Sequence, residues 1–165
     1  MAYSVYTIAG AQPIANTETT QKHPLGTIVR GFDPAIGEGE FIYLLGIAST
    51  EIGSLVKYNT TTWLTTLLVG ATHKNIPSPV AVAMAITDAA TKFGWYGIQG
   101  TFPTDVVANS ADNSTVGRET TDGKVGDGRA AGDQIANAFQ RAATTAAAIV
   151  NVQFDHSYVD DFIGA

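Results

Sequence analysis

The sequence predicts a mainly β protein: a small β-barrel or β-sandwich with an extended N-terminal arm and one short C-terminal helix. Between Gly26 and Gly100, short apolar runs alternate with Gly, Pro and Asn, a pattern typical of strands separated by turns. The 165 residues include no Cys, and a chain of this length buries a core without disulfides. We therefore expect a β-rich domain over residues 25–165, preceded by an arm over residues 1–24.

The predicted arm begins with Tyr3, Val5 and Thr7, which alternate as a short strand does. Gln12-Pro13 and the polar stretch NTETTQKHP follow. That stretch has too little apolar surface to hold itself in place. Two alternatives stay open: a disordered arm, or an arm that lies on a neighbouring molecule.

Four strands are predicted in the first half of the domain. Residues 25–32 form the first, and Asp33-Pro34 ends it. Residues 40–47 (EFIYLLGI) are almost entirely apolar, as expected of a strand that is buried on both faces. Residues 54–58 and 62–69 are the third and fourth strands.

The next segment contains a loop and two strands. His73 to Pro79 is predicted as a loop, because a central strand excludes its two prolines. Val80 to Ile86 suits a helix or a strand, and the flanking Pro79 and TDAATKFG turn favour the strand. Phe93 to Gly100 is an aromatic strand whose glycines indicate a bulge or a close backbone approach.

Beyond Gly100 the chain becomes polar up to Gly132, with Asp-Gly steps at Asp122 and Asp127 that predict tight turns between very short strands. A helix is then predicted over residues 133–148, with Asp133 as N-cap. Its apolar positions follow helical spacing: Ile135, Ala138, Phe139 and Ala142. Residues 148–154 alternate as a closing strand does.

Charge and composition bear on the class of partner. The net charge of −6 argues against nucleic acid, because phosphate binding needs a basic face. Charged residues make up 15%, against about 25% in typical domains, which indicates a surface partly covered by other subunits. No signal peptide and no run of about 20 apolar residues is present, so we expect no membrane partner and synthesis in a cytoplasm.

No metal or cofactor site is predicted. His23, His73 and His156 lack metal-ligand spacing, and we interpret them as surface or hydrogen-bonding histidines. The Asp122–Asp127 region invites a calcium interpretation, but it contains Lys124 and lacks the closing Glu of an EF-hand.

Two groups of residues have the residue types of catalytic sites. Asp155-His156-Ser157 contains the three types of a triad, but adjacent strand residues point to opposite faces. Glu38 and Glu40 share a strand face and resemble a glycosidase pair in type only, so we favour a solvated strand entry. We therefore expect no catalytic residues and no enzymatic activity.

The aromatic pair Trp95-Tyr96, flanked by Gly94 and Gly97, allows two interpretations. Exposed rings stack on sugars, whereas buried rings fill cores or interfaces. We favour a core or interface role.

Several segments together resemble a known family. They are KFGWYGIQG (92–100), the Pro-Val-Ala-Val-Ala run that precedes it, HPLGTIVRGFD (23–33) with GEGEFIYLLG (37–46), and AATTAAAIVNVQF (142–154). Over residues 22–154 the chain is similar to the head decoration, or capsid cement, proteins of tailed bacteriophages. The resemblance implies a small β-barrel or β-sandwich that assembles as a trimer or dimer outside the head and clamps neighbouring major capsid subunits. It implies no shared active site.

The expected function is therefore that of a structural virion protein on the capsid exterior. One alternative is a glycan-binding or adhesive module that uses Trp63, or Trp95 with Tyr96. Another is a small hydrolase built on the Glu38 and Glu40 pair.

Overall fold

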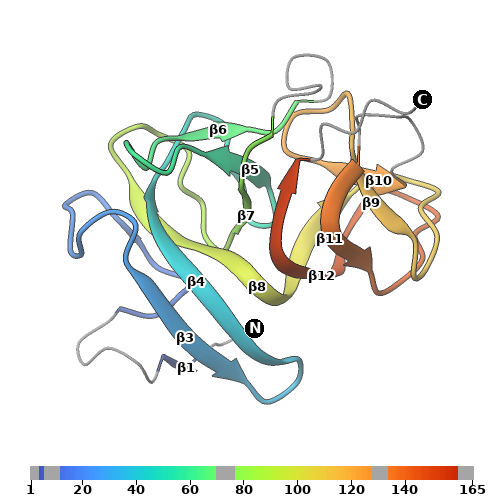
Figure 1. The fold of residues 1–165 in the computed structure, drawn as a ribbon, viewed down its shortest axis with the longest axis horizontal. Coiled ribbons are helices and arrows are strands. Elements are labelled where there is room, and N and C mark those ends of the chain that lie inside the picture. The colour runs from blue at the N-terminus through green and yellow to red at the C-terminus, as the bar shows by residue number, and fades with distance from the viewer. Residues whose placement is uncertain (1–3, 6–11, 70–76, 128–133, 160–165) are drawn as a thin grey trace.

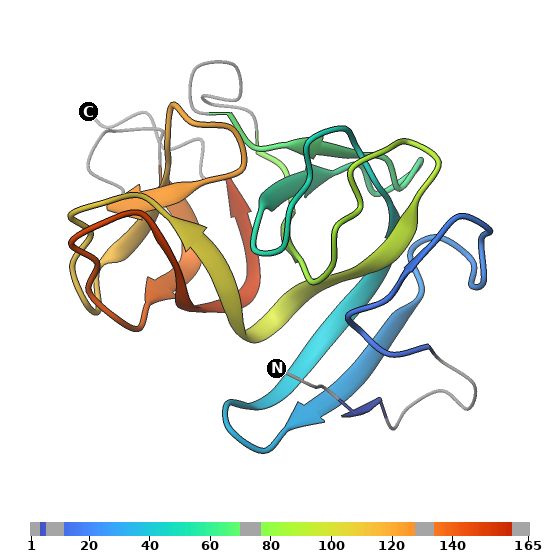
Figure 2. The ribbon, with the colours of Figure 1, turned by 180° about the vertical axis from the view of Figure 1, so that it is seen from behind.

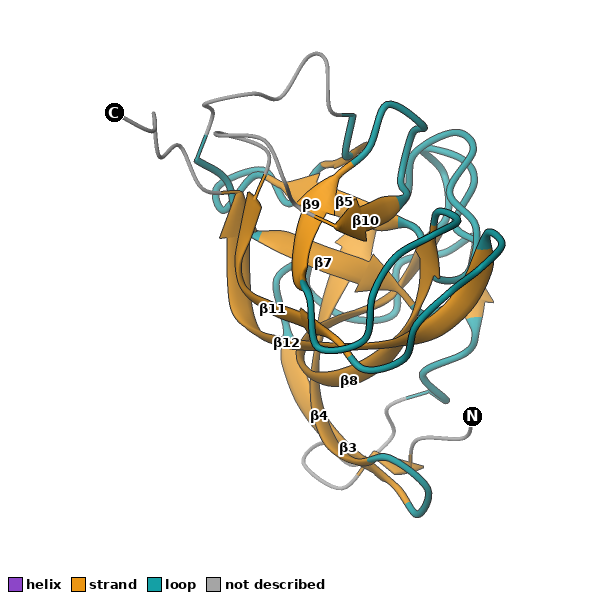
Figure 3. Ribbon diagram, turned by 90° about the vertical axis from the view of Figure 1, so that its right-hand side faces the viewer, coloured by secondary structure: helices purple, strands orange, loops and turns teal. Residues whose placement is uncertain are grey.

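The structure is a computed structural model that describes residues 4–5, 12–69, 77–127 and 134–159. These residues form strands, turns and loops, and none of them lies in a helix (Figure 3). Accordingly, the described part contains no helix long and apolar enough to cross a membrane. The prediction of a mainly β protein is confirmed, whereas the short C-terminal helix is absent from the described residues that were assigned to it.

The strands of the described residues belong to one sheet (Figure 1). In chain order they are β1 (Ser4–Val5), β2 (Thr17–Glu18), β3 (Ile28–Asp33), β4 (Gly37–Leu45), β5 (Leu55–Tyr58), β6 (Thr65–Leu67), β7 (Val80–Ala83), β8 (Phe93–Val106), β9 (Thr115–Arg118), β10 (Val125–Asp127), β11 (Gln134–Gln140) and β12 (Ala148–Val159).

Strand β8 connects the two halves of the sheet (Figure 2). Along its first half, β8 pairs with β4 on one edge. On the other edge it pairs first with β2, at Phe93 and Gly94, and then with β7, at Tyr96 and Gly97. Its second half pairs with β12, and its end pairs with β10. The strands β8, β10, β9, β11 and β12 thus form a closed circuit of paired neighbours.

Glycines allow β8 to bend between its two halves. A Cβ atom at Gly97 would lie 2.6 Å from the Phe102 ring, and one at Gly100 would lie 2.7 Å from the Glu38 carbonyl oxygen. Gly100 also has φ +126°, which is costly for other residues. The predicted bulge is present, because Glu40 pairs with Gln99 whereas Phe41 pairs with Gly97.

The core lies on both faces of β4. Phe41 and Tyr43 join an apolar cluster with Trp95 and Phe102, whereas Ile42 and Leu44 join a second cluster on the other face. Phe41, Tyr43 and Leu44 are fully buried and Ile42 nearly so. The prediction of a strand buried on both faces is therefore confirmed for this segment.

The segment predicted as a helix contains strand β11. Asn137 has φ +58°, and the pairing of β11 with β12 shifts register between Ala136 and Ala138. The extra residues lie on β12, where residues 155–157 stand opposite Asn137 alone. The positive φ of Asn137 breaks the alternation of β11, so that the buried Ile135 and Ala138 stand three positions apart on the strand. A bulged strand thereby imitates the i, i+3 spacing of a helix, which is why the prediction was wrong.

Other boundaries also differ from the predicted ones. Strand β8 continues past Gly100 to Val106, where the sequence is polar and contains Pro103, because β12 pairs along its whole second half. The strand predicted over residues 62–69 is shorter, since Trp63 has φ +59° and β6 begins at Thr65. The strand at Val80–Ala83 is confirmed.

The described part of the predicted arm lies on this chain's own sheet. Strand β1 pairs with β3 and β2 pairs with β8. Ile14 is buried in the main core cluster, and His23 packs its ring 5.3 Å from those of Tyr43 and Trp95. Neither predicted alternative included this intramolecular packing.

The buried phenol of Tyr96 predicts a loss of stability at alkaline pH. Burial raises the pKa of Tyr96 to about 12 from an ordinary 10.0, and its hydroxyl hydrogen-bonds to Thr87 at 2.5 Å. Below pH 10 the phenol is neutral in both states, so its full contribution is present. Above pH 10 only the unfolded state ionises, and the contribution is lost as pH rises towards 12.

Urea unfolding of wild type and Tyr96→Phe between pH 8 and 12 checks this expectation. The wild type should lose more of its free energy of unfolding above pH 10 than the variant does. Parallel curves for the two proteins would contradict it.

Candidate functional site

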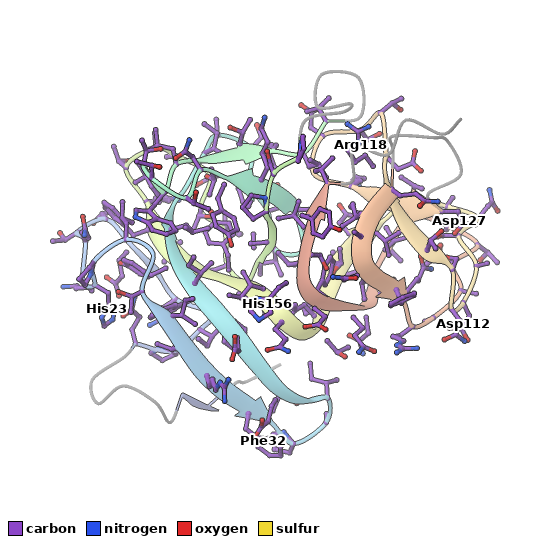
Figure 4. All side chains as sticks on the ribbon, viewed as in Figure 1. His23, Phe32, Asp112, Arg118, Asp127 and His156 are labelled. Atoms are coloured by element: carbon purple, nitrogen blue, oxygen red, sulfur yellow. The ribbon has the colours of Figure 1, made fainter. Side chains whose placement is uncertain are left out.

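A polar groove lies where strands β3, β4, β8 and β12 meet, near His156 in Figure 4. Its volume is about 530 Å³, within the range of ligand sites. The groove is lined by Arg30, Glu38, Gly39, Glu40, Gln99, Gly100, Thr101, Gln153, Phe154 and Asp155.

Strand pairing places polar side chains side by side along this groove. Arg30 pairs with Glu40, Glu40 with Gln99, and Gln99 with Asp155. Directly paired residues project to the same face of a sheet, so these four side chains form one polar row across four strands. The members of the row are far apart in the sequence, so a search for local motifs does not find them.

Hydrogen bonds hold the polar row in place. Arg30 donates from Nε to Glu40 Oε1 at 2.6 Å, and its Nη2 lies 2.5 Å from the same oxygen. The other oxygen of Glu40 lies 3.5 Å from His156 Nε2. Gln99 donates to Asp155 Oδ1 at 3.0 Å. The row therefore presents carboxylate acceptors beside amide and guanidinium donors.

The Glu38 and Glu40 pair belongs to this groove, but its two members differ. The side chain of Glu40 is only 13% exposed and is ion-paired, whereas Glu38 is exposed. The interpretation as a solvated strand entry thus fits Glu38 and does not fit Glu40.

Asp155, His156 and Ser157 do not assemble as a triad. Ser157 is buried and donates to the Asn137 carbonyl at 2.7 Å. His156 is exposed and faces Glu40 instead. The three residues thus do not meet as a triad, but the reason differs from the predicted one. Asp155 and His156 are both exposed instead of pointing to opposite faces, Asp155 in the polar row and His156 beside Glu40 of that row, because His156 has φ +46°.

The rings of Trp95 and Tyr96 are fully buried. Trp95 lies 5.0 Å from Tyr43 in ring centroid distance, and Tyr96 belongs to the second core cluster. The core interpretation is confirmed, so these rings offer no sugar-stacking platform. Trp63 is partly exposed and stacks on Tyr58 at 6.5 Å.

Comparisons with models of protein families, with curated proteins and with solved structures found no match. The site is therefore interpreted from its own residues.

His23 and Asp127, which were considered as metal ligands, form hydrogen bonds within the protein. His23 hydrogen-bonds to Gln12 Oε1 at 2.6 Å, which confirms it as a hydrogen-bonding histidine. His73 lies outside the described residues. Asp127 Oδ1, on the right in Figure 4, accepts from the Ser110 and Ser114 hydroxyls at 2.6 and 2.9 Å.

In the described part of the chain, no three His, Asp or Glu residues stand together as a metal site. The turn predicted at Asp122-Gly123 is present, whereas Asp127 ends strand β10.

A second hollow carries exposed isoleucines, and we call it the isoleucine depression. Its volume is about 520 Å³. Ile52, Ile86 and Ile149 are 47%, 46% and 50% exposed. Lys124 and Asp105 form an ion pair of 2.8 Å in its wall. The full lining is Ser49, Glu51, Ile52, Ser54, Ile86, Asp105, Asp122, Lys124 and Ile149.

Sequence reasoning identified Glu38 and Glu40, and it considered Asp155 only as part of a triad. It missed Arg30, Gln99 and the three isoleucines as surface features. No local pattern marks them, because each stands on a different segment. For Gln99 alone a signal existed: a polar residue beside Gly100 in an otherwise apolar strand.

Proposed function

We propose that this protein is a structural virion protein that binds the outside of a phage head and cements neighbouring major capsid subunits. The proposal follows the family resemblance of residues 22–154. One structural observation supports it: the isoleucine depression exposes three large apolar side chains around one hollow.

A group of exposed isoleucines around a hollow indicates a contact surface. Single exposed apolar residues, by contrast, are common on protein surfaces. Half-exposed Ile86 and Ile149 each still have apolar area to bury. Burying such area contributes about 25 cal/mol per Å². A protruding apolar side chain of a capsid subunit would fill the hollow.

The charges around the depression define the partner further. Glu51, Asp105 and Asp122 carry three formal negative charges against the single positive charge of Lys124. The surface therefore complements a capsid segment that has Lys or Arg beside its apolar side chain.

Oligomerisation would convert modest contacts into firm attachment. In a trimer, or a dimer, the first bound copy raises the effective concentration of the others at the shell. Because the protein binds only the assembled state, it shifts the equilibrium towards the intact head.

Attachment to heads that lack the protein tests the proposal. Purified protein should sediment as an oligomer, rebind such heads and raise the temperature at which they open. A monomer that never attaches to heads would contradict the proposal.

Substitution of the isoleucines should weaken attachment without weakening the fold. Ile86→Ser with Ile149→Ser removes two of the three exposed isoleucines of the depression, so we expect at least tenfold lower affinity for heads. Leu64→Ser is the matched control, because Leu64 is equally exposed, at 50%, and lies outside the depression. Binding by titration and thermal unfolding measure the two effects. Equal affinities of the double variant and the control would argue against this contact surface.

A further inference from the structure

We propose that the polar groove binds an uncharged saccharide through its hydroxyl groups. This inference does not depend on the capsid proposal, since the groove and the isoleucine depression share no residue.

Backbone packing fixes the floor of the groove. Gly100 can be no other residue without strain, because its φ is +126° and a Cβ would meet the Glu38 carbonyl. A Cβ at Gly39 would meet the rings of Phe41 and Phe102 on the core side, so β4 and β8 approach closely beneath the polar row. Gly39, Gly100 and the buried Phe154 all line the groove.

The charges of the groove select against anionic ligands. Arg30 contributes one positive charge, and it is ion-paired with Glu40. Glu38, Glu40 and Asp155 contribute three negative charges, which leaves a formal excess of two negative charges. A phosphate or carboxylate ligand would meet repulsion here.

The hydrogen-bonding groups match hydroxyls, which donate and accept at one atom. Among the described residues, no side chain hydrogen-bonds to the Glu38 carboxylate, which is exposed at the rim. Asp155 accepts from Gln99 through Oδ1 and also lines the groove. Carboxylates would accept from hydroxyls, and the amide of Gln99 and the guanidinium of Arg30 would donate.

An aromatic ring stands beside these polar groups. Phe32 pairs with Glu38 and is 46% exposed, near the end of the β3–β4 hairpin in Figure 4. It lies on the same face as Arg30, two residues away on the strand. The C–H face of a sugar ring packs on such a ring. The exposed Phe32 ring would therefore stack on the sugar, which the buried Trp95 ring cannot do.

Amide chemical shifts in ¹⁵N-labelled protein test the proposal directly. The probes are neutral oligosaccharides of glucose, mannose, galactose and N-acetylglucosamine, with spermidine and inorganic phosphate as charged probes. We expect at least one saccharide to shift the amides of Gln99, Thr101 and Asp155, and phosphate to shift none of them. No saccharide response in the groove, or a response there to spermidine alone, would overturn the proposal.

Paired variants provide the second readout. Asp155→Asn keeps the shape but removes the charge of an acceptor, so we expect about tenfold weaker saccharide binding. Asp112→Asn is the control, because Asp112 is exposed in the loop before β9, far from the groove in Figure 4. Thermal unfolding checks that both variants are folded. Unchanged affinity in Asp155→Asn, or an equal loss in both variants, would place the binding elsewhere.

Discussion

We expect Trp95→Ala to lower the free energy of unfolding by about 3–5 kcal/mol, the range for large core aromatics. Trp95 is fully buried in the main core cluster. Its ring contacts those of Tyr43 and His23, with centroids 5.0 and 5.3 Å away. Alanine would leave a cavity on which the N-terminal segment and β4 both pack. Because domains are stable by about 5–15 kcal/mol in total, this single change should remove a large part of the stability.

Urea unfolding followed by far-UV circular dichroism measures this effect without relying on tryptophan fluorescence. Trp95→Phe should lose much less, because phenylalanine keeps most of the volume and removes an indole N–H that is buried without a hydrogen-bond partner in the described structure. Trp63→Ala serves as a control, since Trp63 is only partly buried. A Trp95→Ala variant as stable as the Trp63 variant would mean that the ring is not in the core.

The same result bears on function. A glycan-binding role for Trp95 would be tested by Trp95→Ala only if the fold survived that change. Because the ring supports the core, a loss of glycan binding in Trp95→Ala would result from unfolding and would not show that Trp95 contacts the glycan. The groove variants are therefore the informative test of saccharide binding.

The second large effect is expected at the bend of β8. Gly100→Ala should lower the free energy of unfolding by about 2–6 kcal/mol, from positive-φ strain of roughly 1–3 kcal/mol plus a backbone clash of similar size. The added Cβ would stand 2.7 Å from the Glu38 carbonyl and 3.0 Å from the Gly39 Cα. Both contacts are backbone atoms, which cannot rotate away as a side chain can.

Gly37→Ala is the matched control for this prediction. Gly37 also has positive φ, +95°, but a Cβ there would meet nothing within 4 Å. Its loss of stability should be limited to backbone strain of roughly 1–3 kcal/mol. Chemical unfolding of both variants separates strain from contact. Equal losses at Gly100 and Gly37 would show that β4 and β8 do not approach closely at this point.

Several elements were predictable from the residues alone because their signals are local. The apolar run over residues 40–47 predicted a strand buried on both faces. The structure places Phe41 and Tyr43 in one cluster and Ile42 and Leu44 in the other. Turn residues predicted the end of β3 at Asp33. Strand β7 followed Pro79 as expected.

Bulges and long-range pairing account for what was not predicted. At Asn137 a positive φ and a shift of register with β12 break the alternation of β11, which gives its buried residues an apparent helix spacing. Strand β8 reached Val106 because β12, far along the chain, supplies its hydrogen-bond partners. The polar segment from Gln12 to His23 packs on the sheet because Ile14 and His23 find partners on β4 and β8 that no local window contains.

By itself the sequence predicted that the protein is mainly built of strands, that β4 is buried on both sides and that Trp95 and Tyr96 have a core or interface role. Alternation and turn chemistry act over a few residues, so they can be read without a structure. Only the tertiary structure decided that Arg30, Glu40, Gln99 and Asp155 stand in one row, and that three separate isoleucines surround one hollow. Those neighbours are created by the register between distant strands, and register is a property of the folded sheet.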